Sequence, residues 1–143
     1  MPEVSRSVIV GYTPAQMFEL VDAVEEYPQF LPWCAGASAT PVDPTTTRAT
    51  LQIDYRGIKQ TFTTDNTKRP PDEMLIRLVN GPFRALEGVW RFVALGTTGC
   101  RVEFRLRYEF SSRLLAKLVG PLFDYIANSM VEAFVKRAEA KYG

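Results

Sequence analysis

The sequence contains no histidine among its 143 residues. This absence excludes Ser-His-Asp and Cys-His nucleophile systems. It also excludes zinc and non-haem iron sites that use histidine ligands. A general base would have to be a carboxylate, a tyrosine, a lysine or a cysteine with a shifted pKa. The sequence therefore excludes the many hydrolytic and metal-dependent mechanisms that require histidine.

Cysteine is almost as scarce, and long hydrophobic runs are absent. Cys34 and Cys100 form no C-x-x-C pair, so we expect two free thiols in a reducing cytoplasm. No stretch approaches the roughly 18 apolar residues that a membrane-spanning helix needs. Glu3 follows Met1 too closely for a secretory signal. The sequence thus predicts a cytoplasmic protein.

The remaining composition is that of an ordinary globular domain, with 46% hydrophobic and 23% charged residues. The net charge is only +1, but residues 48–117 carry thirteen basic and seven acidic residues. A basic region favours an anionic membrane surface or nucleic acid, and a solvated sheet face of mixed charge is the alternative. No nucleic-acid-reading motif is present, so DNA is not an expected partner.

The first part of the chain predicts a strand, a helix and short turns. Valines alternate with polar residues over 4–10, which predicts a strand that ends at Gly11. Thr13 is a suitable cap for a helix that begins at Pro14. The prolines in segment 27–34 restrict it to a compact, aromatic-rich turn.

From residue 35 onward, apolar and polar residues alternate, which is typical of strands with one buried face. The pattern is clearest over 101–110, where every second residue is apolar. The predicted strands are 35–42, 48–56, 58–67, 74–79, 84–95 and 101–110. Together they predict an antiparallel meander.

The end of the chain predicts one long helix. Ser111 or Ser112 caps it, and apolar residues then follow at helical spacing as far as Phe134. Gly120-Pro121 is expected to bend or restart the helix. Only this helix is large enough to cover the inner face of the sheet, so the expected fold is α+β, a curved sheet gripping one helix. Such a sheet closes poorly on a single helix, which leaves room for a cavity.

The sequence offers few side chains that could serve as catalytic groups. Glu25 and Glu26 are adjacent on a helix and point apart, and Asp72-Glu73 follows two prolines at a strand start where solvent is expected. Tyr55 and Tyr108 have the hydroxyls to polarise a carbonyl, but tyrosines in such positions more often belong to the core. The sequence therefore predicts no catalytic and no metal-binding residue, and a cyclase or dehydratase would lack an evident base.

Three segments carry a family resemblance. Residues 27–34 read Y-P-Q-F-L-P-W-C, residues 81–92 contain G-P-F-x-x-L-x-G-x-W-x-F, and residues 133–143 contain A-F-x-x-R-A-x-x-x-Y-G. Together they resemble the coenzyme-Q-binding START-like family of the polyketide cyclase/dehydrase superfamily, which includes bacterial ribosome association toxins. The resemblance implies a helix-grip (START/Bet v 1-like) fold with about seven strands, formed by residues 1–143 as a single lipid-binding domain.

The resemblance also implies two functions. The first is non-enzymatic binding of ubiquinone or a similar isoprenoid lipid in an apolar tunnel, in support of respiratory electron transport, with no cofactor besides that ligand. The alternative is a ribosome-binding toxin that blocks subunit association at the large ribosomal subunit, with Arg101, Arg105 and Arg107 on rRNA phosphates. A carrier would act in the cytoplasm of a bacterium and touch the anionic inner membrane from its periphery.

Aromatic side chains dominate the predicted inner face, as in pockets for apolar ligands, although the same residues would serve equally to fill a core. The candidate ligand-binding residues are Phe30, Trp33, Tyr55, Phe62, Phe83, Trp90, Phe92, Tyr108, Ile126 and Met130. Trp90 is expected to form the tunnel wall beside a gap at Gly88, because glycine in a strand allows close approach of another group.

Overall fold

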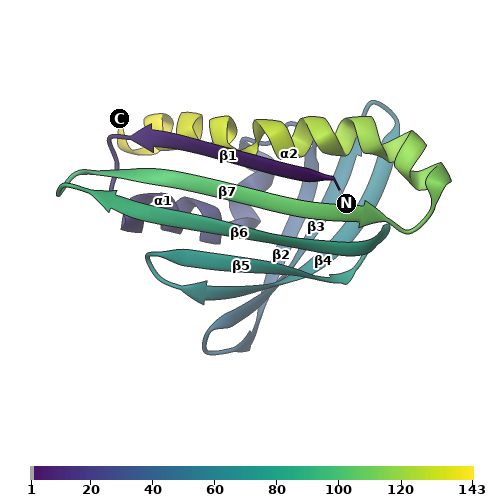
Figure 1. The fold of residues 1–143 in the computed structure, drawn as a ribbon, viewed down its shortest axis with the longest axis horizontal. Helices are drawn as coiled ribbons and strands as arrows, with labels where there is room; N and C mark the ends of the chain where they lie inside the picture. Colours follow the sequence, from purple (N-terminus) through teal and green to yellow (C-terminus); the bar gives the residue numbers. More distant parts are fainter. Residues whose placement is uncertain (1) are drawn as a thin grey trace.

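The elements of the protein follow the predicted order in the computed structural model, which describes residues 2–143 (Figure 1). The strands are β1 (Glu3–Val10), β2 (Cys34–Asp43), β3 (Thr46–Tyr55), β4 (Ile58–Arg69), β5 (Glu73–Asn80), β6 (Phe83–Leu95) and β7 (Gly99–Phe110). The helices are α1 (Pro14–Asp22), the 3-10 helix η1 (Val24–Gln29) and α2 (Arg113–Tyr142).

All seven strands form one antiparallel sheet in the order β1-β7-β6-β5-β4-β3-β2. Consecutive strands from β2 to β7 pair with one another, whereas β1 pairs with the last strand, with Glu3 opposite Arg107. In Figure 1, β3 and β4 run steeply across the direction of β6 and β7, and α2 lies along one side of the sheet. The predicted helix-grip fold is confirmed.

Local sequence explains how the first helix begins. The Thr13 hydroxyl accepts a hydrogen bond from the Gln16 backbone N–H at 3.1 Å, and the Gln16 side chain accepts one from the Thr13 N–H at 2.8 Å. This reciprocal capping box satisfies two amide groups that would otherwise lack partners. Pro14 follows at the first helical position, as predicted.

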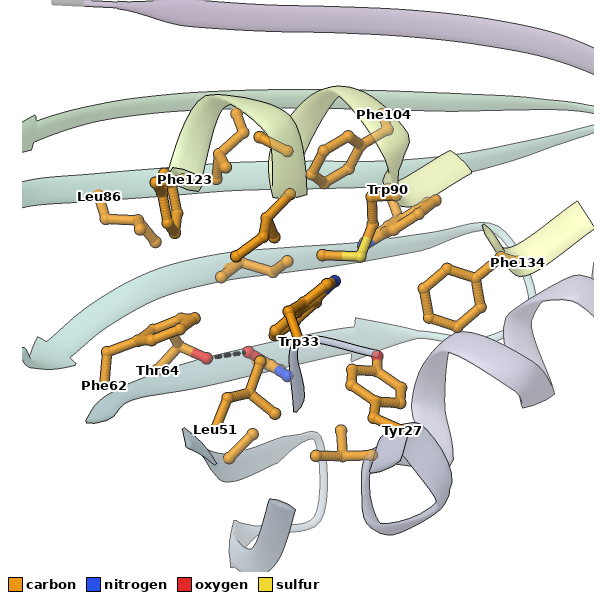
Figure 2. Close-up of a pocket in the computed structure, with 18 residues that line it drawn as sticks. Tyr27, Trp33, Leu51, Phe62, Thr64, Leu86, Trp90, Phe104, Phe123 and Phe134 are labelled. Carbon is orange, nitrogen blue, oxygen red and sulfur yellow. Dashed lines mark hydrogen bonds between the residues drawn. The ribbon is translucent and has the colours of Figure 1, made fainter. Parts of the chain in front are cut away.

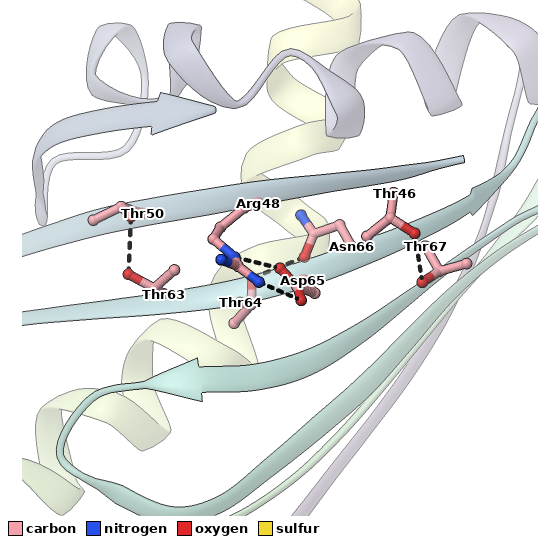
Figure 3. A network of polar contacts seen from close by, with 8 residues as sticks. All are labelled: Thr46, Arg48, Thr50, Thr63, Thr64, Asp65, Asn66 and Thr67. Carbon is pink, nitrogen blue, oxygen red and sulfur yellow. Dashed lines mark hydrogen bonds and ion pairs between the residues drawn. The ribbon is translucent and has the colours of Figure 1, made fainter. Parts of the chain in front are cut away.

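Cross-strand polar pairs hold β3 against β4 on the outer face of the sheet (Figure 3). Thr50 and Thr63 share a hydrogen bond of 2.9 Å, and Arg48 donates to both carboxylate oxygens of Asp65 at 2.8 and 3.1 Å. Pairs of this kind help to set the register between strands. Because side chains alternate along a strand, the residues between them on β4 face the interior.

Helix α2 is continuous through Pro121, so of the expected bend or restart, the restart does not occur. Ser112 is its N-cap, and the Ser112 hydroxyl accepts a hydrogen bond from the Leu115 N–H at 3.1 Å. Proline leaves the carbonyl four residues earlier without its helical partner. Pro121 and Lys117 are both exposed, so water can satisfy that carbonyl and the helix continues.

Two further expectations concern the membrane and the thiols. No helix among residues 2–143 is long and apolar enough to cross a membrane. Cys34 and Cys100 are both free and buried. The expectation of two unpaired cysteines is therefore confirmed.

Candidate functional site

A cavity of about 70 Å³ lies between the sheet and α2 (Figure 2). Its lining comes from η1, from the loop before β2, from strands β3 to β7 and from α2. The volume exceeds the roughly 10–15 Å³ that one water requires but is far below the roughly 300–1,000 Å³ of typical ligand pockets. The fold therefore contains an apolar space that a larger molecule has to widen.

Two polar side chains interrupt the apolar lining, and both lie on β4. Thr64 and Asn66 are each 6% exposed, and the Thr64 hydroxyl donates to Asn66 Oδ1 at 2.8 Å. The Asn66 amide nitrogen has no hydrogen-bond partner within residues 2–143. Every fully buried side-chain nitrogen or oxygen in that range does have a partner. The amide nitrogen therefore reaches open space, where it is available to donate to a ligand.

Trp33 lies between the cavity and an outer groove. Its side chain is 2% exposed and lines both the cavity and this outer groove of about 330 Å³. The groove runs between the Phe30–Trp33 segment and the exposed side of α2. This indole is therefore part of the wall that the cavity and the groove share.

The ten candidate ligand-binding residues fall into two equal groups. Five line the cavity: Trp33, Phe62, Trp90, Ile126 and Met130. The other five are Phe30, Tyr55, Phe83, Phe92 and Tyr108, which do not line it. That any of the ten contacts a ligand stays a prediction.

The five residues outside the cavity have identifiable positions. Phe83, Phe92 and Tyr108 are buried in the aromatic core. Phe30 lines the outer groove beneath the Arg137 guanidinium, which lies 4.9 Å from its ring centre. Tyr55 lines a separate groove beside α2. Alternation identified the inner face correctly but not how deep each side chain lies.

The polar pair and part of the apolar lining are not among the residues predicted from the sequence. Thr64 and Asn66 share the parity of Phe62 on β4, so the same alternation that turned Phe62 inward could have identified them. Tyr27 and Phe134 also line the cavity. Both lie in motifs that carried the family resemblance.

The expected gap beside Trp90 is filled. Trp90 does line the cavity, but a Cβ added to Gly88 would lie 2.9 Å from Leu106 Cδ1 and 3.1 Å from the Arg105 carbonyl oxygen. Glycine at this position therefore admits the leucine of the neighbouring strand. It does not leave free space for a ligand.

Charged acid–base groups are absent from the cavity lining, which contains no Asp, Glu, Lys, Arg or Cys and has Tyr27 as its one ionisable side chain. Within residues 2–143, every aspartate and glutamate is exposed or half-buried. No group of three or more metal-ligating side chains occurs in that range either. A cyclase mechanism would have no carboxylate in the cavity to act as its base.

Tyr27 lines the cavity and is a titratable residue whose pKa is shifted by its surroundings. Burial, with a smaller contribution from the nearby Asp22, raises its pKa well above the usual range, and its hydroxyl donates to the Val21 carbonyl. Burial likewise raises the pKa of the Cys34 and Cys100 thiols. The folded protein therefore favours the neutral form of all three groups.

We expect the protein to lose stability in alkali. The unfolded chain ionises its thiols near pH ~8.5 and Tyr27 near pH ~10, whereas the folded chain stays neutral. The stabilisation is thus complete below these values and falls as the pH rises through them. Replacing Tyr27 with Phe should cost about 1 kcal/mol at neutral pH for the lost hydrogen bond.

The contribution of Tyr27 can be isolated by urea unfolding across a pH series. By about pH 11 the wild type should have lost roughly 1.4 kcal/mol through Tyr27 alone, a loss that the Tyr27→Phe variant does not share. The two stabilities should therefore converge or cross. Parallel curves for the two proteins would contradict the shift.

The outer sheet face carries most of the basic region, and most of its arginines are paired with acids. Arg107 contacts Glu87 at 3.3 Å and Glu3 at 3.8 Å, and Arg105 also contacts Glu3, at 3.6 Å. Arg101 lies 3.8 Å from Glu103. The three arginines predicted to meet rRNA are thus partly neutralised by neighbouring carboxylates.

The curved sheet, the long helix and the apolar space between them define a helix-grip protein of the START-like class. The same architecture occurs in a START superfamily protein from Mycobacterium smegmatis (TM-score 0.75, 22% identity, 96% of this chain and 97% of that one). The Zhui aromatase/cyclase from a Streptomyces species has it too (TM-score 0.86, 14% identity, 99% of this chain and 96% of that one). These likenesses concern the fold alone.

Residues 10–135 match the family described as polyketide cyclase / dehydrase and lipid transport, and the chain belongs to that family. The ribosome association toxin RatA of Escherichia coli is 40% identical over 142 residues, which cover 99% of this chain and 90% of the toxin. The mitochondrial coenzyme Q-binding protein COQ10 homolog B of Xenopus laevis is 31% identical over 146 residues, which cover 99% of this chain and 59% of that protein. The family resemblance predicted from the motifs is confirmed.

Proposed function

We propose that this protein, acting as one domain, binds ubiquinone or a similar isoprenoid lipid without catalysing a reaction. The observation that carries the proposal is the apolar cavity with its single polar pair on β4. Similarity to a coenzyme Q-binding protein over 99% of the chain supports the choice of ligand. A quinone presents carbonyl acceptors on an apolar body, which matches a cavity of this composition.

The energetics favour such a ligand. Each isoprene unit holds five carbons, and burial is worth roughly 0.8 kcal/mol per carbon group before ordering costs. In the ring region, the free Asn66 amide N–H is suited to a quinone carbonyl. The Thr64–Asn66 bond fixes the position of that donor.

The present cavity volume requires movement on binding. About 70 Å³ is too little for a ring and its tail, so the ligand must displace part of the wall. Trp33 is the wall residue that also faces the outer groove. We propose that the tail leaves the cavity past Trp33 and lies in this groove.

The primary test is extraction of protein purified from cells, with quinones identified by mass spectrometry. Extractable ubiquinone, or saturable binding of added ubiquinone, is expected. Protein that is consistently empty and fails to bind added quinone would exclude the proposal.

A sharper test replaces Asn66 with Leu, which keeps the volume and removes the donor. Loss of one hydrogen bond to the ring should weaken ubiquinone binding by about three- to tenfold. The matched control is Thr63→Val on the same strand, because Thr63 bonds to Thr50 on the outer face. If both variants bind like the wild type, Asn66 has no part in binding.

A second candidate function is association with the ribosome. It is favoured by the similarity to the toxin RatA, at 40% identity across almost the whole chain. Its test is a sucrose gradient of ribosomes with added protein at low salt, where a blocked subunit association would reduce the 70S peak. An unchanged 70S peak would exclude this function.

A further inference from the structure

The first half of α2 exposes apolar side chains along one side. Leu114, Leu118 and Tyr125 are 65%, 59% and 53% exposed, and Pro121 between them is exposed as well. Successive spacings of four, three and four residues keep all four on one side of a helix. We call these four residues the α2 stripe. The next positions on the same side are Ser129 and Glu132, which are polar and charged. The apolar stripe therefore ends at Tyr125.

Unpaired cations flank the stripe. Arg113 and Lys117 lie on α2 and Arg56 lies at the turn between β3 and β4, and all three are exposed. None of them takes part in an ion pair within residues 2–143. Segment 113–125 contains one acidic residue, Asp124, beside the two cations Arg113 and Lys117. On the outer sheet face, by contrast, most arginines are paired with carboxylates, and Arg77 is an exposed exception.

The β3–β4 turn brings its arginine to the helix. Arg56 and Gly57 both have positive φ, at 52° and 82°, which produces a tight hairpin. Arg56 and Ile58 form a groove of about 380 Å³ with Pro121 and Tyr125 of α2. The cation at the turn therefore lies beside the apolar stripe.

The stripe is also continuous with the route to the cavity. Tyr125 lines the groove beside the turn and the outer groove that contains Trp33. Trp33 in turn lines the cavity. An apolar molecule at the stripe would have protein contacts along the whole path inward.

We propose that the α2 stripe, with Arg56, Arg113 and Lys117, docks the protein onto an anionic phospholipid bilayer. A bilayer accepts the leucines among its acyl chains and attracts the cations through its phosphates. Ribosomal RNA would use the cations but would gain little from exposed leucines. The inference rests on the proposed function, because an apolar cargo requires a membrane as its source.

The test is co-sedimentation of the full chain with quinone-free vesicles of phosphatidylcholine, with and without phosphatidylglycerol. The wild type should bind the anionic vesicles, and binding should weaken as salt is raised. The double variant Leu114→Gln/Leu118→Gln should lose at least about tenfold in affinity. The double variant Arg113→Gln/Lys117→Gln should lose a similar factor and most of the salt dependence.

Two matched controls lie on the outer sheet face. Ile9→Gln/Val93→Gln removes two apolar side chains that are 69% and 42% exposed. Arg105→Gln/Arg107→Gln removes the same charge as the helix variant. Both controls should bind vesicles as the wild type does, and thermal melts verify that every variant is folded.

The docking proposal fails if the wild type does not bind anionic vesicles, if the helix variants bind normally, or if the controls weaken equally. It also fails if the helix cations matter only for binding to purified ribosomes while the leucines matter for neither partner. The vesicles contain no quinone, so vesicle binding does not depend on the proposed ligand. A protein that binds vesicles but no quinone would exclude quinone as the ligand and would still support the docking proposal.

Discussion

Replacing Trp90 with Ala is expected to lower both the stability and the ligand binding of the folded protein. The indole is 3% exposed, and its ring centre lies 4.4 Å from that of Phe104 and 5.4 Å from that of Phe134. Removing a buried Trp costs roughly 3–5 kcal/mol. We expect about 3 kcal/mol, because one side of the indole already faces the cavity.

The matched control for Trp90 is Phe92→Ala on the same strand. Phe92 is 2% exposed and packs on Phe18 at 5.9 Å, but it does not line the cavity. Its loss should cost a similar roughly 3–5 kcal/mol. Urea midpoints measure stability, and ubiquinone retained per folded molecule measures binding. Retention should fall at least about tenfold only for Trp90→Ala, and an equal fall in both variants would assign Trp90 to packing alone.

Replacing Gly81 with Ala should be nearly as damaging, although it adds a single methyl group. Gly81 has φ +152°, and a Cβ there would lie 2.6 Å from Phe62 Cβ and 3.2 Å from Phe62 Cα. Backbone strain and overpacking add, so we expect a loss of about 3 kcal/mol. Since Phe62 lines the cavity, its displacement should weaken ligand binding as well.

Gly96→Ala separates these two costs. Gly96 also has positive φ, at +65°, but a Cβ there meets nothing within 4 Å. Strain alone should cost about 1–2 kcal/mol. Thermal or urea unfolding compares the variants, and equal losses at the two glycines would mean that contact with Phe62 adds nothing.

The sequence predicted the elements better than the site. Strict alternation on β7 and the Thr13-Pro14 start of α1 led directly to the observed structure. Alternation tells which side of a sheet a residue faces, but curvature decides which inward side chains reach the cavity. Trp90 reaches it and Phe92, on the same face of the same strand, does not. Such depth depends on packing between distant segments, which no local pattern contains.

Of the bend or restart expected at Gly120-Pro121, the restart does not occur, and for a related reason. A local rule treats proline as a helix breaker. The side chains of Val119, Leu122 and Phe123, on either side of the proline, are buried. The free energy of their burial outweighs the loss of one hydrogen bond. Tertiary contacts therefore decide how far α2 extends.

The pairing of β1 with β7 has a consequence for the order in which the protein assembles during synthesis. The strand made first finds its hydrogen-bonding partner only after residues 99–110 have left the ribosome, because Val10 pairs with Cys100 and Glu3 with Arg107. The lid of the cavity, α2, emerges later still. The central hairpins can form during translation, but the sheet edge and the apolar interior stay exposed until residues 113–142 have emerged. A lipid that binds during synthesis would meet the open inner face of the sheet. Under the proposed function, a lipid enters the folded domain by displacing part of the cavity wall.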